Sequence, residues 1–292
     1  MIKTKIRTSL NTKLSSLKQM GGIDLNAQDL KLMKYFYQKI LNLEIIEENK
    51  DSIIFAKNKT QLITLHHDND LQSANPRAAG LYHFALLFSS RSELAITIER
   101  ILRLAPKFFS GSADHLVSEA FYFSDPEGNG IELYYDRDES IWQWKDGQIK
   151  MATLYIDPMS YINKYAGLAE KDIGIKMGHI HLKVGDIEKA KLFYVDILGF
   201  DITALLPGAL FVSVNGYHHH LGMNTWESYG AEPGKEALGL KQFAFELSDR
   251  EDFQNLKYRL RQNQVRLEED KELIIFRDPW QNQIKVQLIA NF

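Results

Sequence analysis

The chain has 292 residues, of which 45% are hydrophobic and 25% charged, as expected for a globular protein of about two domains. Its formal net charge of −3 gives no basic surface for nucleic acid, and no apolar run approaches the roughly 20 residues of a membrane helix. Cysteine is absent, which excludes disulfides and thiolate metal sites and favours a reducing, cytoplasmic setting.

The first 20 residues form a basic segment with five Lys and Arg side chains, no acidic side chain and many Ser and Thr residues. A transit peptide has a similar composition. A secretory signal would need an apolar core and a small-residue cleavage site, which this segment lacks. We expect an N-terminal arm or an edge strand.

Residues from about 20 to 68 are predicted to form a βαβββ unit. Asp29 can cap a helix that carries Leu32, Phe36 and Ile40 at helical spacing. Alternating and β-branched residues predict a strand at 22–27 before this helix, and strands at 43–48, 52–56 and 60–66 after it.

Residues from about 80 to 136 are predicted to form a second unit of the same kind. The apolar run LYHFALLF predicts its first strand, and a helix is expected from Ser92 to about Leu104. The segment AFYFSDPEGNGIELYY predicts a closing hairpin, because its Pro, Gly and Asn residues supply the turn.

A third unit is expected at about 177–226 and a fourth at about 238–289. The third has a predicted helix at 186–197 and strands near 200–206, 209–214 and 217–223. The fourth ends in a hairpin, RDPWQNQIKVQLI. Residues 137–176 match neither half of the internal repeat, and they are predicted to be a connector with a short helix at 158–168. This organisation divides the chain into an N-terminal domain (1–136), the connector and a C-terminal domain (177–292).

Two internal repeats support this division. The segment MGGIDLNAQDLKLMKYFYQKILNL from Met20 recurs 157 positions later as MGHIHLKVGDIEKAKLFYVDILGF from Met177. FSDPEGNGIEL from Phe123 recurs as FRDPWQNQIKV from Phe276. Since the helix of a βαβββ unit covers only one face of its small sheet, units must pair through the other face. We predict an α+β fold in which four units pair into cupped mixed sheets.

The motifs of these repeats resemble the vicinal oxygen chelate superfamily, which includes glyoxalase I, the fosfomycin-resistance proteins and the extradiol ring-cleaving dioxygenases. The resemblance covers nearly the whole chain from about residue 20. It is carried by GLYHFALL, DHLVSEAFYFSDPEGNGIELYYDRD, MGHIHLKV and YHHHLGMNTW, which together look most like the bacterial catechol 2,3-dioxygenase type.

The resemblance implies metal ligands on the first and last strands of paired units. The matching positions are Gly22, His83, His179 and Gln242 on first strands, with Glu132 and Lys285 on last strands. Only a pairing of the second and third units combines His83, Glu132 and His179. Two histidines and one carboxylate form the facial triad of Fe(II) oxygenases, with Mn(II) or another divalent metal as the alternative. Taken singly, His83 could be a packed core residue and Glu132 an exposed strand residue.

The resemblance also implies residues that handle protons and bind the activated substrate. His219, in the run YHHHLG, is the candidate acid–base residue, and Tyr122 and His115 are further candidate catalytic residues. Strand alternation predicts that His218 and His220 point away from His219, although a register error of one residue would reverse these roles. The run of histidines could also be a surface feature, and Tyr122 an ordinary core aromatic.

Three other histidines receive softer assignments. His181 is expected on the same face as His179, where it could line the pocket or orient a ligand. His66 and His67 match no ligand position and are expected at the surface.

Three functions follow from these features. The first is an Fe(II)-dependent extradiol dioxygenase that uses O2 to open a catechol or hydroquinone-like ring. The alternatives are a glyoxalase-like metal lyase or thiol transferase, and a non-catalytic protein that binds aromatic compounds or drugs. The expected partners are a small aromatic substrate and O2, with no nucleic acid and no membrane. A homo-oligomer is one option for the assembly.

Overall fold

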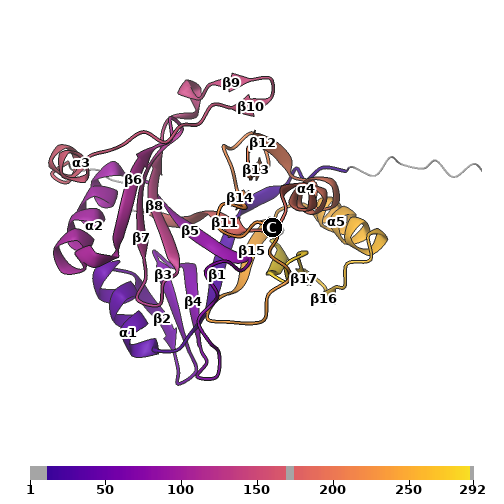
Figure 1. Cartoon of the computed structure of the whole chain (residues 1–292), viewed down its shortest axis with the longest axis horizontal. Helices are drawn as coiled ribbons and strands as arrows, with labels where there is room; N and C mark the ends of the chain where they lie inside the picture. Colours follow the sequence, from indigo (N-terminus) through magenta and orange to yellow (C-terminus); the bar gives the residue numbers. More distant parts are fainter. Residues whose placement is uncertain (1–11, 169–173, 290–292) are drawn as a thin grey trace, which may run out of the picture.

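The computed structural model describes residues 12–168 and 174–289 (Figure 1). Residues 1–11, which make up most of the basic segment, lie outside the described residues. The part of the arm that follows packs on the C-terminal half, where the Leu14 amide donates to the Gly199 carbonyl at 2.9 Å. In the described ranges, no helix combines the length and apolarity that a membrane crossing requires.

Two eight-stranded sheets form the scaffold, and each combines strands from both halves of the chain. We call them sheet A and sheet B. In spatial order, sheet A contains β16 (Glu268–Asp270), β17 (Leu273–Arg277), β18 (Gln283–Leu288), β15 (Gly239–Leu247), β1 (Leu17–Ala27), β4 (Thr60–His67), β3 (Ser52–Lys57) and β2 (Glu44–Glu48). Sheet B contains β12 (Asp201–Leu206), β13 (Ala209–Ser213), β14 (Leu221–Asn224), β11 (Ile175–Lys183), β5 (Gly80–Phe88), β8 (Gly130–Asp136), β7 (Ser118–Ser124) and β6 (Phe109–Asp114).

This topology confirms the predicted α+β fold with mixed sheets, and it confirms the pairing of the middle of the chain. β5 and β11 lie antiparallel at the centre of sheet B, and β1 and β15 have the same relation in sheet A. The sheets therefore do not coincide with the halves 1–136 and 177–292, and that division stays a prediction from the repeats. The expectation of an edge strand is wrong for residues 17–20, because they belong to β1, which lies inside sheet A between β15 and β4.

The helices follow the repeat. The first repeated helix consists of α1 (Leu30–Tyr35) followed by a π-helical turn, η1 (Phe36–Ile40). Its counterpart in the second repeat consists of α4 (Ile187–Lys191) followed by η4 (Leu192–Ile197). Asp29 accepts a hydrogen bond from the Leu32 amide at 2.9 Å, as the cap prediction requires. Phe36 and Ile40 are buried as predicted, but Leu32 is 46% exposed, and Met33 is buried in its place. The remaining helices of these stretches are α2 (Arg91–Leu104), a 3-10 turn η2 (Pro106–Phe108) and α5 (Arg250–Gln262).

Each repeated helix is tied to the next stretch of chain by a buried tyrosine–aspartate hydrogen bond. The Tyr37 hydroxyl donates to Asp125 at 2.7 Å, and the Tyr194 hydroxyl donates to Asp278 at 2.8 Å. Both aspartates lie in the repeated turn before the last strand. Burial raises the pKa of Asp125 and of Asp278, and the hydrogen bonds from the tyrosines oppose this by stabilising the charged carboxylates. The repeat thus encodes a link between neighbouring units.

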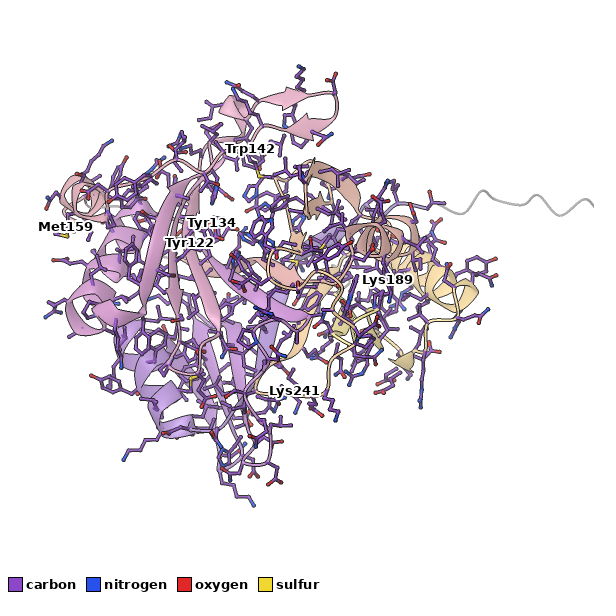
Figure 2. All side chains as sticks on the ribbon, in the orientation of Figure 1. Tyr122, Tyr134, Trp142, Met159, Lys189 and Lys241 are labelled. Atoms are coloured by element: carbon purple, nitrogen blue, oxygen red, sulfur yellow. The ribbon has the colours of Figure 1, made fainter. Side chains whose placement is uncertain are left out.

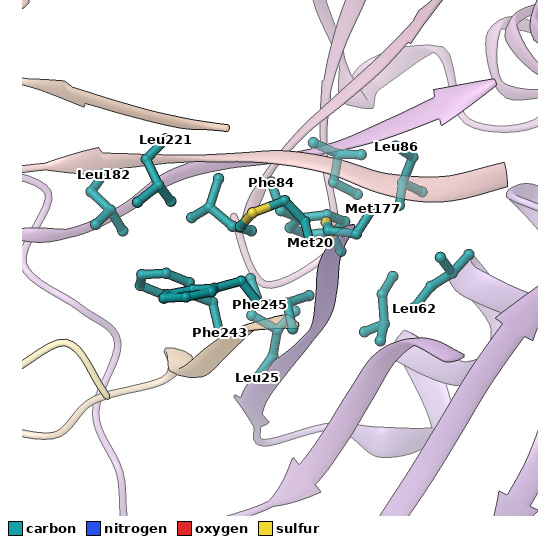
Figure 3. Packing of buried hydrophobic residues seen from close by; sticks show 14 of the residues in the cluster. Met20, Leu25, Leu62, Phe84, Leu86, Met177, Leu182, Leu221, Phe243 and Phe245 are labelled. Atoms are coloured by element: carbon teal, nitrogen blue, oxygen red, sulfur yellow. The ribbon is translucent and has the colours of Figure 1, made fainter. Parts of the chain in front are cut away.

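The main hydrophobic core lies between the central strands of the two sheets (Figure 3). Side chains alternate along a strand, so the opposite face of sheet B carries a different set of residues. On β5, Phe84 and Leu86 enter the main core, whereas Ala85 belongs to a small cluster with Ala120 and Tyr134 on the other face. We call that second face the site face, because it also carries the candidate metal ligands.

The connector spans the site face from one edge of sheet B to the other. The Leu154 amide of the connector donates to the Asp114 carbonyl on β6 at 3.0 Å, and the Leu205 amide on β12 donates to Gln148 at 2.9 Å. Its elements are η3 (Glu139–Ile141), β9 (Trp144–Lys145), β10 (Gln148–Ile149) and α3 (Pro158–Tyr165). The predicted helix 158–168 is therefore present but shorter. The small β9–β10 hairpin, seen at the top of Figure 1, was not predicted.

Candidate metal centre

Three candidate ligands converge on the site face of sheet B. The Nε2 atom of His83 lies 2.9 Å from Oε2 of Glu132, and Nε2 of His179 lies 3.3 Å from the same oxygen. One donor atom from each of the three residues falls within 4.8 Å of the other two. All three side chains are buried, with exposed fractions of 7% or less. The structure thus brings together the three residues that the sequence placed at ligand positions.

The register of three neighbouring strands explains this convergence. β5 runs parallel to β8 with Ala85 opposite Glu132, and antiparallel to β11 with Ala85 opposite His179. His83 is two residues before Ala85, so it shares the same face of the sheet. The methyl group of Ala85 leaves the space between the three longer side chains free. A one-residue slip of either neighbouring strand would turn a ligand into the main core.

The electrostatics and the donor set fit a divalent cation. Burial alone would raise the pKa of Glu132, but the His179 and His83 imidazoles together hold it well below the usual range. Burial lowers the pKa of His179, which favours the neutral ring that a metal requires. The Nε2 atom of His83 is buried and, among the described residues, makes no aligned hydrogen bond despite its closeness to Glu132. A cation between these lone pairs would satisfy them.

Tyr122 and His115 form a hydrogen-bonded pair beside the candidate ligands. Tyr122 lies opposite Glu132 in the β7–β8 pairing, and its ring centroid is 5.7 Å from that of His83. Its hydroxyl lies 2.6 Å from Nε2 of His115, whose Nδ1 lies 2.7 Å from the Ala152 carbonyl oxygen. A carbonyl only accepts, so Nδ1 of His115 donates to Ala152, and Nε2 of His115 shares the second hydrogen bond with the Tyr122 hydroxyl. Burial, and then the Glu132 carboxylate, raise the pKa of Tyr122 well above the usual value.

His219 lies against the candidate ligand His179, with a ring separation of 4.1 Å. The prediction that His218 points away from it is wrong, because the Nδ1 atoms of the two rings are 2.8 Å apart. Alternation does not apply here, since the predicted strand 217–223 begins only at Leu221 and residues 217–220 follow a bent backbone. Burial, and then the neighbouring histidines, lower the pKa of His219 well below the usual value.

Sequence reasoning missed a buried network behind His218. Nε2 of His218 lies 2.8 Å from Oδ1 of Asp136, whose Oδ2 accepts from the Tyr217 hydroxyl at 2.7 Å. The Tyr134 and Tyr217 hydroxyls are 2.9 Å apart. Alternation along GIELYYD could have found part of it, because Glu132, Tyr134 and Asp136 share one face. Figure 2 shows Tyr122 and Tyr134 close together on sheet B, below Trp142 of the connector.

Gly178 explains one feature of the repeated motif. A Cβ atom at this position would lie 1.8 Å from the Tyr134 hydroxyl, so only glycine admits the tyrosine. The strand pairing shifts register between Met177 and His179, which sends Met177 into the main core and leaves His179 on the site face. The glycine therefore helps to place both a candidate ligand and the network.

The remaining histidines have more ordinary surroundings. His181 lies on the site face as predicted, with its ring 4.9 Å from that of His83, and its Nε2 lies 3.0 Å from the Asn224 amide nitrogen. His66 and His67 are half-buried rather than fully at the surface. His66 pairs with Asp24 at 3.2 Å.

The equivalent positions of sheet A present different chemistry. Gly22 offers no ligand, Gln242 hydrogen-bonds with Gln283 at 2.9 Å, and Lys285 replaces the carboxylate. A cavity of about 360 Å³ lies over these three residues, whereas neither this cavity nor a smaller one of about 230 Å³ is lined by the candidate ligands. The ammonium group of Lys285 cannot ligate a cation. We therefore place the candidate metal site in sheet B, although the cavity of about 360 Å³ lies over sheet A.

A family model decides where this chain belongs. The model of the Glyoxalase/Bleomycin resistance protein/Dioxygenase superfamily matches residues 19–133 and 176–286. The chain belongs to this superfamily. The two matched segments correspond to the two repeats and leave the connector between them, in agreement with the resemblance seen in the sequence.

The relatives narrow the class of enzyme. The chain is 34% identical over 268 residues to a catechol-2,3-dioxygenase from Bacillus subtilis (strain 168), covering 89% of this chain and 93% of the relative. It is 24% identical over 127 residues to biphenyl-2,3-diol 1,2-dioxygenase 2 from Rhodococcus globerulus, covering 42% of this chain and 65% of that protein. The solved structure of glyoxalase I from Zea mays matches with a TM-score of 0.56 at 12% identity over 92% of each chain, which shows the shared fold. The extended first match identifies this chain as an enzyme of the dioxygenase type.

Proposed function

We propose that this protein is an Fe(II)-dependent extradiol dioxygenase that opens a catechol or hydroquinone-like ring with O2. The observation that carries the proposal is the convergence of His83 and His179 on one buried oxygen of Glu132. Two neutral imidazoles and one carboxylate would hold a divalent ion and would leave it able to bind a diol and O2.

His83, His179 and Glu132 would hold the metal, and Mn(II) is the alternative occupant. Fe(II), when bound, supplies the redox chemistry that lets O2 react with a chelated aromatic diol. The protein contributes burial, because a cluster sheltered from water strengthens charge interactions with the bound ring. It also contributes a single ligand charge, which compensates the ion only in part and favours binding of a deprotonated diol.

Tyr122 and His115 are proposed to orient the substrate. The Tyr122 hydroxyl, which is hydrogen-bonded to Nε2 of His115 beside the candidate ligands, would hydrogen-bond to a substrate hydroxyl. His219 is proposed as the acid–base residue, because its ring lies against His179 and burial keeps it neutral. A neutral imidazole can take the proton that a diol must lose when it chelates a metal.

The decisive experiment is anaerobic loading with Fe(II), followed by oxygen-electrode assays on a panel of catechols and hydroquinones. We expect one O2 consumed per ring opened, with both atoms of labelled oxygen in the product and no added reductant. A parallel sample loaded with Mn(II) distinguishes the two metals. Tight diol binding without a ring-opened product would favour the aromatic-binding alternative. Conversion of a hemithioacetal, or addition of a thiol, without oxygen uptake would favour the glyoxalase-like or transferase alternative.

A further inference from the structure

His219 is held at one nitrogen by a chain of groups that begins on another strand. From Asp136 on β8, the chain passes to Nε2 of His218 at 2.8 Å, and from Nδ1 of His218 to Nδ1 of His219 at 2.8 Å. His218 is completely buried, and the ring of Tyr217 packs on it at 4.1 Å with an interplanar angle of 33°. The ring of Trp142 in the connector lies 5.3 Å from that of His218 and 5.9 Å from that of Tyr217. The geometry of the chain is therefore fixed by packing.

The donor and acceptor roles along this chain follow from Asp136. An ionised carboxylate only accepts, so the proton in the first contact lies on Nε2 of His218. With one proton on the His218 ring, its Nδ1 is bare and can only accept. In that arrangement the proton in the second contact lies on Nδ1 of His219, and the Nε2 of His219 is bare. Among the described residues, the hydrogen bond that holds the His219 ring lies on its Nδ1.

We propose that Asp136 and His218 are positioning residues that hold His219 with its proton on Nδ1 and its Nε2 free to accept a proton from the substrate. This inference deepens the proposed function and rests on it for the identity of the substrate. Asp136 and His218 need not touch the aromatic ring. Their contribution is to exclude the other tautomer of His219, which would present an N–H where a proton acceptor is required.

Tyr217 influences which groups donate and which accept along the chain of hydrogen bonds. Its hydroxyl donates to Oδ2 of Asp136, and Tyr134 supplies the next hydroxyl at 2.9 Å. Both carboxylate oxygens therefore accept, one from Tyr217 and one from His218. An asparagine at position 136 has only one acceptor oxygen, so it must turn its NH2 group toward either the tyrosine or the histidine. With Tyr217 present, the asparagine can satisfy the hydroxyl and reverse the tautomers of His218 and His219.

The test compares Asp136→Asn, Tyr217→Phe and the double variant. In metal-free protein labelled with ¹⁵N-histidine, long-range ¹H–¹⁵N spectra report which nitrogen of His219 carries the proton, with His219→Gln used for assignment. We expect Nδ1–H in the wild type and in Tyr217→Phe, and Nε2–H in Asp136→Asn. The double variant should return toward Nδ1–H, because the asparagine oxygen can then turn to His218.

Turnover supplies the second readout. In iron-loaded Asp136→Asn we expect kcat to fall by roughly 10²-fold to 10⁴-fold, the range of a lost acid–base group, with KM and iron content unchanged. The double variant should recover part of this loss. A wild-type His219 with Nε2–H, or an unchanged tautomer in Asp136→Asn, would overturn the proposal. A wild type that opens no ring would instead refute the proposed function, while the tautomer measurement would still decide the positioning role.

Discussion

Sheets A and B share one backbone plan but differ in what their inner strands present. Asp24 lies opposite Gln242 in sheet A, as His181 lies opposite His83 in sheet B, and Ala244 lies beside Lys285 as Ala85 lies beside Glu132. The strand registers of the two sheets therefore match residue by residue. The comparison shows that the scaffold creates the convergence of side chains, whereas a few side chains decide whether it can hold a cation.

The largest expected effect comes from removing a candidate ligand of sheet B, whereas changes at the equivalent positions of sheet A should have no effect on metal binding. His83→Ala or Glu132→Ala should lower iron retention and ring opening by more than about 100-fold, because each removes a ligand from a three-ligand set. Metal analysis after gel filtration and the oxygen electrode measure this. The matched controls are Gln242→Ala and Lys285→Ala, which alter the equivalent positions of sheet A. Full metal occupancy in His83→Ala or Glu132→Ala would contradict the assignment of that residue as a ligand.

The next effect concerns catalysis with the metal retained. His219→Gln should lower kcat by roughly 10²-fold to 10⁴-fold while iron content stays near that of the wild type. Gln61 lies two residues before Ile63, as His219 lies two before Leu221, so it is the residue that sheet A carries at this place. Gln61→Ala should leave turnover unchanged. If both variants were as active as the wild type, His219 would have no proton-transfer role.

A third comparison concerns how the free energy of unfolding changes at acidic pH. Burial lowers the pKa of His220 to about 3, whereas an unfolded histidine titrates near 6.5. The unfolded state therefore takes up a proton that the folded state refuses, and stability is lost as the pH falls from about 6.5 toward 3, by up to about 1.4 kcal/mol per pH unit. His220→Gln should flatten this slope in chemical denaturation of metal-free protein. His66→Gln, on sheet A, is the control, and an equal flattening there would locate the acid sensitivity elsewhere.

The smallest effect should be the same in both halves of the chain. Tyr37→Phe and Tyr194→Phe each remove one buried donor to an aspartate, with an expected cost of about 1–3 kcal/mol in the free energy of unfolding. Denaturant titrations of the metal-free variants give both values. Since the two contacts are copies, the costs should agree to within about 1 kcal/mol. A much larger cost on one side would show that the repeated turns have different structural roles.

The local pattern of the sequence was sufficient for most of the elements. Apolar alternation and turn residues located the strands around His83 and Glu132, and Asp29 marked the start of its helix as predicted. The errors arose where local rules were extended too far. Leu32 proved exposed, since the buried face of its helix passes through Met33, and the bent backbone at 217–220 removed the alternation assumed for His218.

By itself, the sequence determined the repeat and the α+β class, because strand and helix periods and turn chemistry act over a few residues. The short set of candidate ligands came from the resemblance of its motifs to the superfamily. Only the tertiary structure decided that one oxygen of Glu132 meets both His83 and His179, since that depends on the register of three strands. It alone placed Asp136 behind His218, because the contact joins a strand end to a bend far away in the chain. Contacts between distant segments follow from packing, and no local pattern in either segment records them.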